Sequence, residues 1–265
     1  MPVESARRAK QPVSRLGAEE LTEDGRDIFR TLTGHFSALA PLSVAERELL
    51  RELSAASRYH PPSRDLHGVG PPPPVTRLIV SGWACRYRRL PGGRRQIVSF
   101  MLPGNFVGPV LRPRFLSPCA VAAITEVETV DATRLVEAAH AVDPAHPGLA
   151  LAVRLMAHWE DWLLCDQIVR LGRQTASGRF AHLMLELSGR LVRLGLATDD
   201  TFAMPLTQEV LADALGLSVV HVNRTVQLLR REGLLDVRGG TVSLLQPQRL
   251  RALASWAPLP QPTAR

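Results

Sequence analysis

This sequence is poor in cysteine and contains no long apolar run. Its three cysteines, Cys85, Cys119 and Cys165, are widely separated and fit a reducing compartment. No apolar run approaches the length of a membrane span, and the charged first residues lack the apolar core of a signal peptide. We therefore expect a cytoplasmic chain with no membrane partner and no metal site.

Lysine is nearly absent as well. Lys10 is the only lysine among 32 basic residues, and we attribute this bias to genomic base composition rather than to selection for guanidinium chemistry. The formal net charge of +7 nevertheless suits a polyanionic partner. Because the chain also lacks a phosphate-binding glycine loop and a nucleophile elbow, an enzyme is not expected.

The segment from Leu206 to Leu235 carries the most informative pattern. It predicts two short amphipathic helices joined at Gly216, with Thr207 capping the first and Ser218 capping the second. Glycine supplies the backbone freedom that such a tight turn requires. The pattern predicts a helix-turn-helix whose second helix enters the major groove of DNA, and the alternative is a helical hairpin with a purely structural role.

The second helix of this motif separates a buried side from exposed ones. We expect Val222, Val226 and Leu229 to face the protein core. Gly233 ends the helix, and two short strand patterns flank Gly239-Gly240, which predicts the wing of a winged helix-turn-helix. The expected DNA-contacting residues are Thr207, Ser218, Val219, Val220, His221, Asn223, Arg224 and Gln227.

The stretch GLSVVHVNRTVQLLRREGLL, from Gly216 to Leu235, resembles the DNA-reading end of the Crp/Fnr family of bacterial regulators. The similarity extends backward through GRQTASGRFAHLMLEL and more loosely to residues 82–108. The resemblance implies a dimeric transcription factor with an α+β fold. That fold would comprise an N-terminal antiparallel β-roll like a cyclic-nucleotide-binding domain, a long dimerisation helix and a C-terminal winged helix-turn-helix.

The resemblance also suggests which bases the second helix reads. In the family, an arginine at the position of Arg224 contacts guanine, and a glutamate that accepts a hydrogen bond from cytosine commonly stands where this chain has Val220. Valine has no acceptor, so we expect contact with a thymine methyl group there, adenine pairing by Asn223, and His221 nearer the phosphates. The alternative is that Val219 and Val220 pack the helix start and touch no base.

The sensor region is expected to begin with helices and continue as strands. Ser43 and Glu46 form a capping-box pattern that predicts a helix from Ser43 to Ser57, and alternating strand patterns continue to Val130. The expected segments are a disordered basic extension (1–27), the sensor with flanking helices (28–146), the dimerisation helix (147–173), the winged helix-turn-helix (174–255) and a tail (256–265).

The sensor departs from the pattern of cyclic-nucleotide-binding relatives. Residues 103–108 preserve a PG-x-F-x-G turn, but Pro109 stands where those relatives carry a ribose-binding glutamate. Residues 117–120 read Ser-Pro-Cys-Ala, where those relatives carry an arginine that contacts the cyclic phosphate. Proline offers neither a donor nor a charge, so cyclic AMP and cyclic GMP are not expected unless Arg112 or Arg114 acts from an unfamiliar position. The candidate effector-pocket residues are Gly104, Asn105, Phe106, Val107, Gly108 and Cys119.

No cofactor is expected in this sensor. Iron-sulfur members of the family use four thiolates, mostly near the N-terminus, whereas no cysteine precedes Cys85. Haem stays open through scattered histidines or cysteines, without a pattern that favours it. A redox-active thiol at Cys85 or Cys119 is the specific mechanism that the sequence excludes least, and burial of both as small apolar residues is the alternative that we favour.

A long helical pattern runs from Leu149 to Arg170 with apolar residues on more than one face. Leu155, Trp159 and Trp162 have the four-three spacing of a dimer seam, while burial within one subunit is the alternative. The residues placed to pack on the roll beside this seam are Met156 and Leu163.

Two classes of function remain open. The first is a homodimeric transcriptional regulator that binds an inverted repeat in double-stranded DNA and is gated by an effector or a redox signal, with RNA polymerase as a further candidate partner. The second is an effector-independent DNA-binding or architectural protein whose sensor domain is a degenerate scaffold.

Overall fold

The computed structural model describes residues 21–258, except for residues 72, 74, 109–115, 141–144 and 199. Most of the predicted N-terminal extension therefore lies outside the described residues, as do Pro109, Arg112 and Arg114 of the predicted sensor pocket.

Two helices open the described part of the chain. α1 (Glu23–Ser37) is capped by Thr22, so the last residues of the predicted disordered extension are helical. α2 (Val44–Leu53) starts with the predicted capping box, in which the Ser43 amide donates to the Glu46 carboxylate at 2.7 Å and the Glu46 amide to the Ser43 hydroxyl at 3.2 Å. The helix ends earlier than predicted because Ser57 already pairs with Val130 in a strand.

The sensor strands form two antiparallel sheets of four strands each, with orders β1-β8-β3-β6 and β2-β7-β4-β5. Ile79 and Val127 of the first sheet and Met101 and Val121 of the second are buried in one cluster between them. This is the predicted antiparallel β-roll. Its strands are β1 (Ser57–His60), β2 (Asp65–His67), β3 (Arg77–Ser81), β4 (Ala84–Arg89), β5 (Arg95–Met101), β6 (Phe106–Val107), β7 (Ala120–Ala123) and β8 (Val127–Asp131).

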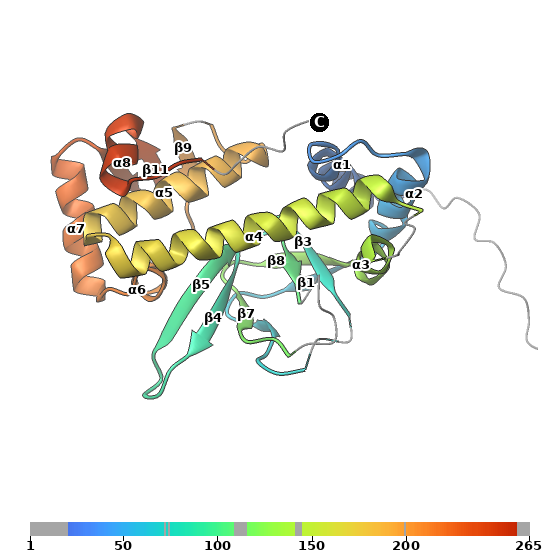
Figure 1. Ribbon diagram of the computed structural model, residues 1–265, viewed down its shortest axis with the longest axis horizontal. Helices are drawn as coiled ribbons and strands as arrows, with labels where there is room; N and C mark the ends of the chain where they lie inside the picture. The colour runs from blue at the N-terminus through green and yellow to red at the C-terminus, as the bar shows by residue number, and fades with distance from the viewer. Residues whose placement is uncertain are drawn as a thin grey trace, which may run out of the picture.

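α3 (Thr133–His140) leads to α4 (Pro147–Arg173), which runs along the whole molecule from the N-terminal helices to the C-terminal ones (Figure 1). Its first turn is fixed by Glu46 of α2, whose carboxylate accepts the Leu149 amide at 2.9 Å. Met156 and Leu163 are buried, as predicted for the side that packs against the sensor. α4 thus connects the two halves of the chain.

α5 (Ala176–Arg193) folds back beside α4 and is capped by Thr175 (Figure 1). The elements after it form the predicted winged helix-turn-helix, with a three-stranded sheet of order β10-β11-β9. They are β9 (Thr201–Ala203), α6 (Gln208–Leu215), α7 (Val219–Arg231), β10 (Leu235–Arg238), β11 (Thr241–Leu244) and α8 (Pro247–Ala254).

The two halves share one apolar core. Tyr87, Ile97 and Phe100 of the sensor are buried in the same cluster as Phe180 of α5 and Leu215 of α6. The division at residues 146 and 174 that the sequence suggested therefore does not separate independent cores in this arrangement.

Hydrogen bonds close this junction between the β4–β5 hairpin and α6. The Arg95 guanidinium donates to the Asp213 carboxylate at 2.6 Å, and the Gln96 amide donates to the Asp213 carbonyl at 2.8 Å. From α4, the Gln167 amide donates to the Ala214 carbonyl at 2.8 Å. The first helix of the DNA-reading motif is thus held directly against the sensor.

Candidate nucleic-acid interface

The turn between α6 and α7 has the predicted caps. The Thr207 hydroxyl accepts the Val210 amide and the Ser218 hydroxyl accepts the His221 amide, each at 3.2 Å. Gly216 lies between the helices with φ of 62°, in the left-handed region that glycine adopts without strain. The local sequence therefore fixes both helix starts and the turn that sets the angle between them.

The buried side of α7 differs in one position from the prediction. Val222 and Leu229 are fully buried, but Val226 is only partly buried, and Thr225 takes the third buried position. Thr225 lies three residues after Val222 and four before Leu229, so helical geometry places it on the same face. Its hydroxyl donates to the His221 carbonyl at 2.8 Å, which satisfies the polar group inside the core.

The opposite side of α7 is exposed and carries the predicted base-contacting residues. Val220 is 58% exposed, which makes a role in packing the helix start unsuitable for this side chain. An ion pair within α7 would be an alternative reason for an arginine at position 224, but Arg224 has no ion-pair partner among the described residues. The exposed positions at the start and along this side are Ser218, Val219, Val220, His221, Asn223, Arg224 and Gln227.

A hollow of about 440 Å³ lies beside this exposed side. One wall comes from α7, including Val220, His221 and Arg224, and the other from Thr175 and Ser177 at the start of α5. The sequence analysis did not single out Thr175 or Ser177. The available indication was the capping threonine in GRQTASGR, which the structure shows bonded to the amide of the first turn of α5.

The wing is the predicted hairpin. β10 pairs with β11 in antiparallel register around Gly239 and Gly240, whose φ values of 55° and 74° suit a turn with two left-handed residues. The Asp236 carboxylate accepts Arg230 of α7 and Arg238 of the wing, each at 2.8 Å. This shared carboxylate ties the wing to the end of the recognition helix.

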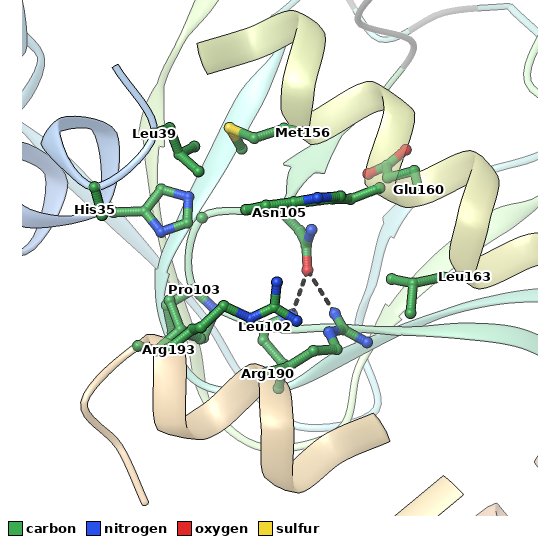
Figure 2. A pocket seen from close by; sticks show the side chains of 14 residues that line it. His35, Leu39, Leu102, Pro103, Asn105, Met156, Glu160, Leu163, Arg190 and Arg193 are labelled. Atoms are coloured by element: carbon green, nitrogen blue, oxygen red, sulfur yellow. Dashed lines mark hydrogen bonds between the residues drawn. The ribbon is translucent and has the colours of Figure 1, made fainter. Parts of the chain in front are cut away.

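The predicted effector-pocket residues do not gather around one space. Gly104 and Asn105 line a cavity with α1, α4 and α5 (Figure 2), whereas Phe106, Val107 and Cys119 are buried in the sensor and do not line it. Asn105 is fixed by two hydrogen bonds to its side-chain oxygen, from the Leu102 amide and from Arg190. Gly108, also outside this cavity, lies against Pro73.

The sensor cysteines are enclosed thiols. Burial raises the pKa of Cys85 to about 11 and also raises the pKa of Cys119. A thiol that stays protonated at neutral pH is a poor nucleophile, so both observations favour burial over a redox role. Cys165 is exposed on α4. Within the described ranges, no three His, Cys, Asp or Glu side chains are grouped as a metal site would require, and no helix there is long and apolar enough to cross a membrane.

The structure separates the three predicted seam residues of α4. Trp162 is 38% exposed and Leu155 is partly exposed, but Trp159 lines the cavity of its own chain, with the Arg193 guanidinium 4.9 Å from its ring centre. Trp159 therefore contacts α5 of its own chain, and the spacing of apolar residues on α4 does not reveal this contact. The seam itself stays a prediction.

Comparisons with known proteins agree with this geometry. The model of the Crp-like helix-turn-helix domain matches residues 178–253. The chain is 36% identical over 180 residues to the nitrogen fixation regulation protein FixK of Bradyrhizobium diazoefficiens, covering 67% of this chain and 73% of that protein. It is 31% identical over 217 residues to the transcriptional activatory protein AadR of Rhodopseudomonas palustris, covering 81% and 87%.

A solved structure shows the same architecture. FixK2 from Bradyrhizobium japonicum superposes with a TM-score of 0.65 at 28% identity, over 76% of this chain and 98% of that one. The similarity includes the sensor as well as the DNA-reading end, since almost all of that chain is covered.

Proposed function

The chain belongs to the Crp/Fnr family of DNA-binding transcriptional regulators, and from this premise we propose that two copies of it bind an inverted repeat in double-stranded DNA. The observation that carries the proposal is the exposed side of α7. There Asn223, Arg224 and Gln227 have no hydrogen-bond or ion-pair partner among the described residues. Donors and acceptors left without protein partners on a recognition helix are available to base edges.

We place the two-fold seam along an exposed line of α4. Leu151 is 45% and Val169 51% exposed, and Leu155, Trp162 and Cys165 lie between them at alternating spacings of four and three residues with His158. Apart from His158, this line would expose apolar side chains along the helix, which a second copy covers. A two-fold dimer then presents its α7 helices to successive major grooves, about 34 Å apart.

Contacts with DNA divide into specifying and positioning groups. Arg224 is proposed to contact guanine, Val220 a thymine methyl group and Asn223 an adenine. Phosphate contacts are assigned to His221, to Thr175 and Ser177 across the hollow, and to exposed Arg238 of the wing. Thr207 and Ser218 mainly hold the two helix starts.

An effector or redox signal is proposed to control binding, with cyclic nucleotides and iron-sulfur clusters not expected. A regulator of this kind acts in the cytoplasm beside the chromosome, and RNA polymerase is a further candidate partner. The second candidate function is constitutive DNA binding with the sensor as a scaffold. The shared core and the Arg95–Asp213 contact favour it, because contacts within the chain itself hold the DNA-reading motif against the sensor.

Binding-site selection from randomised duplex DNA tests the main proposal. The selected sites should contain an inverted repeat with half-site centres one helical turn apart and a G·C pair in each half. Selection of unrelated sequences, with an affinity that depends on salt concentration and not on sequence, would indicate non-specific binding and would contradict a sequence-reading role.

A further inference from the structure

A cavity of about 270 Å³ lies where the sensor meets α5 (Figure 2). Its walls come from α1, the turn at residues 102–105, α4 and the end of α5, so both halves of the molecule contribute. Pockets of this size suit a small molecule rather than a nucleotide. The apolar part of the lining is formed by Leu39, Leu102, Met156, Leu163 and Leu194.

The charged groups of this cavity are out of balance. Glu160 is already paired with Arg86 at 3.4 Å, and Arg190 is bonded to Glu186 at 3.1 Å and to Asn105 at 3.0 Å. Arg193, in contrast, is an exposed residue at the end of α5 and has no carboxylate partner among the described residues. Desolvation, and after it the neighbouring Arg190, lowers the pKa of Arg193.

The Arg193 guanidinium is nevertheless held in place. It lies over the Trp159 ring at 4.9 Å, and its Nε donates to the Gly189 carbonyl at 3.2 Å. The cation–π contact and one backbone bond leave the terminal nitrogens without a protein partner, and Figure 2 shows the Arg193 side chain extending from α5 into the cavity. Such a fixed guanidinium can bind a carboxylate with two parallel hydrogen bonds.

His35 of α1 lines another part of the cavity. His35 Nε2 is buried and has no hydrogen-bond partner in the described part of the chain. The ring lies so close to Gly104 that a Cβ there would come within 2.5 Å of Nε2, so the glycine makes room for it. The edge of the ring that carries Nε2 therefore faces the backbone at Gly104, and His35 closes this wall of the cavity.

We propose that this cavity binds a small monocarboxylate with an apolar body. The carboxylate pairs with Arg193, and the apolar body packs on Met156 and Leu163. The one guanidinium of the lining without a carboxylate partner matches the single negative charge of a monocarboxylate. The proposal rests on the gated form of the proposed function and names the ligand class of that gate.

Binding here would be coupled to DNA reading. The cavity wall formed by Arg190, Arg193 and Leu194 belongs to α5, which shares its core with α6 and α7. A ligand that contacts both the sensor turn and α5 therefore favours one arrangement of the two halves. By linkage it must change DNA affinity by the same factor by which DNA changes ligand affinity.

Isothermal titration calorimetry on the full chain tests the site with benzoate, phenylacetate and hexanoate, each paired with its uncharged amide. At least one acid should bind at one molecule per subunit, and its amide at least tenfold more weakly. Arg193→Gln should weaken acid binding at least tenfold. Arg30→Gln, which removes an exposed arginine of α1 paired with Asp27, should leave it unchanged.

Absence of binding by all three acids at millimolar concentration would overturn the site, as would equal affinities for acids and amides or an unaffected Arg193→Gln. DNA titration with and without the bound acid tests the coupling, which requires a change of at least fivefold and is overturned by equal affinities. DNA binding by the free protein is measured in the same series. If the free protein does not bind DNA, the proposed function is wrong. If it binds DNA but none of the acids, only the proposed cavity ligand is wrong.

Discussion

The recognition helix and the sensor cavity present polar groups under opposite conditions. On α7, the side chains of Asn223, Arg224 and Gln227 are exposed and available to an external partner. At the junction, Arg170 and Arg190 are buried and bound to Glu186 within the chain. Exposed groups cost the free protein little, whereas buried charges are tolerated only when they are paired. The DNA-reading surface is therefore ready before DNA arrives, and the junction depends on internal partners.

The largest effect should come from disrupting the proposed dimer seam on α4. Trp162→Asp places a charge on the proposed α4 seam and should give monomers at low micromolar concentration. Affinity for a full inverted repeat should fall at least 100-fold, because the two half-sites no longer bind as one unit. Sedimentation velocity and DNA titration measure both effects. Val44→Asp, at an exposed position of α2, is the matched control, and a Trp162→Asp dimer would move the interface elsewhere.

Breaking the buried ion-pair network of Glu186 with Arg170 and Arg190 should lower the free energy of unfolding by a comparable amount. Burial opposes ionisation of Glu186, but Arg170 and Arg190 outweigh it and hold the pKa of the carboxyl below its usual value. Glu186→Ala leaves two buried guanidiniums without this partner and should lower the free energy of unfolding by about 3–5 kcal/mol. Urea unfolding measures the loss. Exposed Glu137→Ala should change stability by less than about 0.5 kcal/mol, and a similarly small effect at Glu186 would refute the contrast.

A smaller change should redirect base recognition without touching stability. Val220→Glu introduces an acceptor at an exposed position, so the preferred base pair there should change from A·T to C·G. The expected discrimination in favour of the C·G pair is about 1–3 kcal/mol. Site selection with the variant and the parent chain shows the change. Leu196→Glu, an exposed apolar-to-acidic change outside α7, should leave the motif as it is. An unaltered motif for Val220→Glu would mean that residue 220 contacts no base.

The effect that is smallest near neutral pH is a pH slope from His35. Burial lowers the pKa of His35 to about 4, so from pH 6.5 down to that value the unfolded chain takes up a proton that the folded chain does not. Stability should therefore fall with decreasing pH by up to about 1.4 kcal/mol per pH unit from this residue. His35→Gln should remove that part of the slope in urea unfolding, and exposed His221→Gln should keep it. Equal slopes for His35→Gln and the parent would contradict the burial account.

The same contrast explains what the sequence could and could not predict. The helix-turn-helix was predictable because its determinants are local: Thr207, Gly216 and Ser218 act on neighbouring amides and on their own backbone. The cavity was not, because Asn105 meets Arg190 across 85 residues of chain. Only Gly104 and Asn105 of its lining were among the predicted pocket residues.

Periodicity also has a limit at α4. The apolar spacing correctly indicated a helix with apolar residues on more than one face, and it placed Met156 and Leu163 on the sensor side, where both are buried. It could not distinguish Trp159 from Trp162, because the difference is made by α5, which packs over one of them and not the other. Likewise, Val226 and Thr225 both suit the buried side of α7 by spacing, and tertiary packing selects Thr225.

The central claim is that α7 reads sequence through Arg224. The most direct measurement is the ratio of affinities for two duplexes that differ only in having G·C or A·T at the Arg224 position of each half-site. The parent chain should prefer G·C by about 5- to 150-fold per half-site, in keeping with a bidentate contact of about 1–3 kcal/mol. Arg224→Lys, which keeps the charge but loses the planar fork, should lose most of that preference while still binding DNA. An unchanged preference in Arg224→Lys and Arg224→Ala would contradict the account.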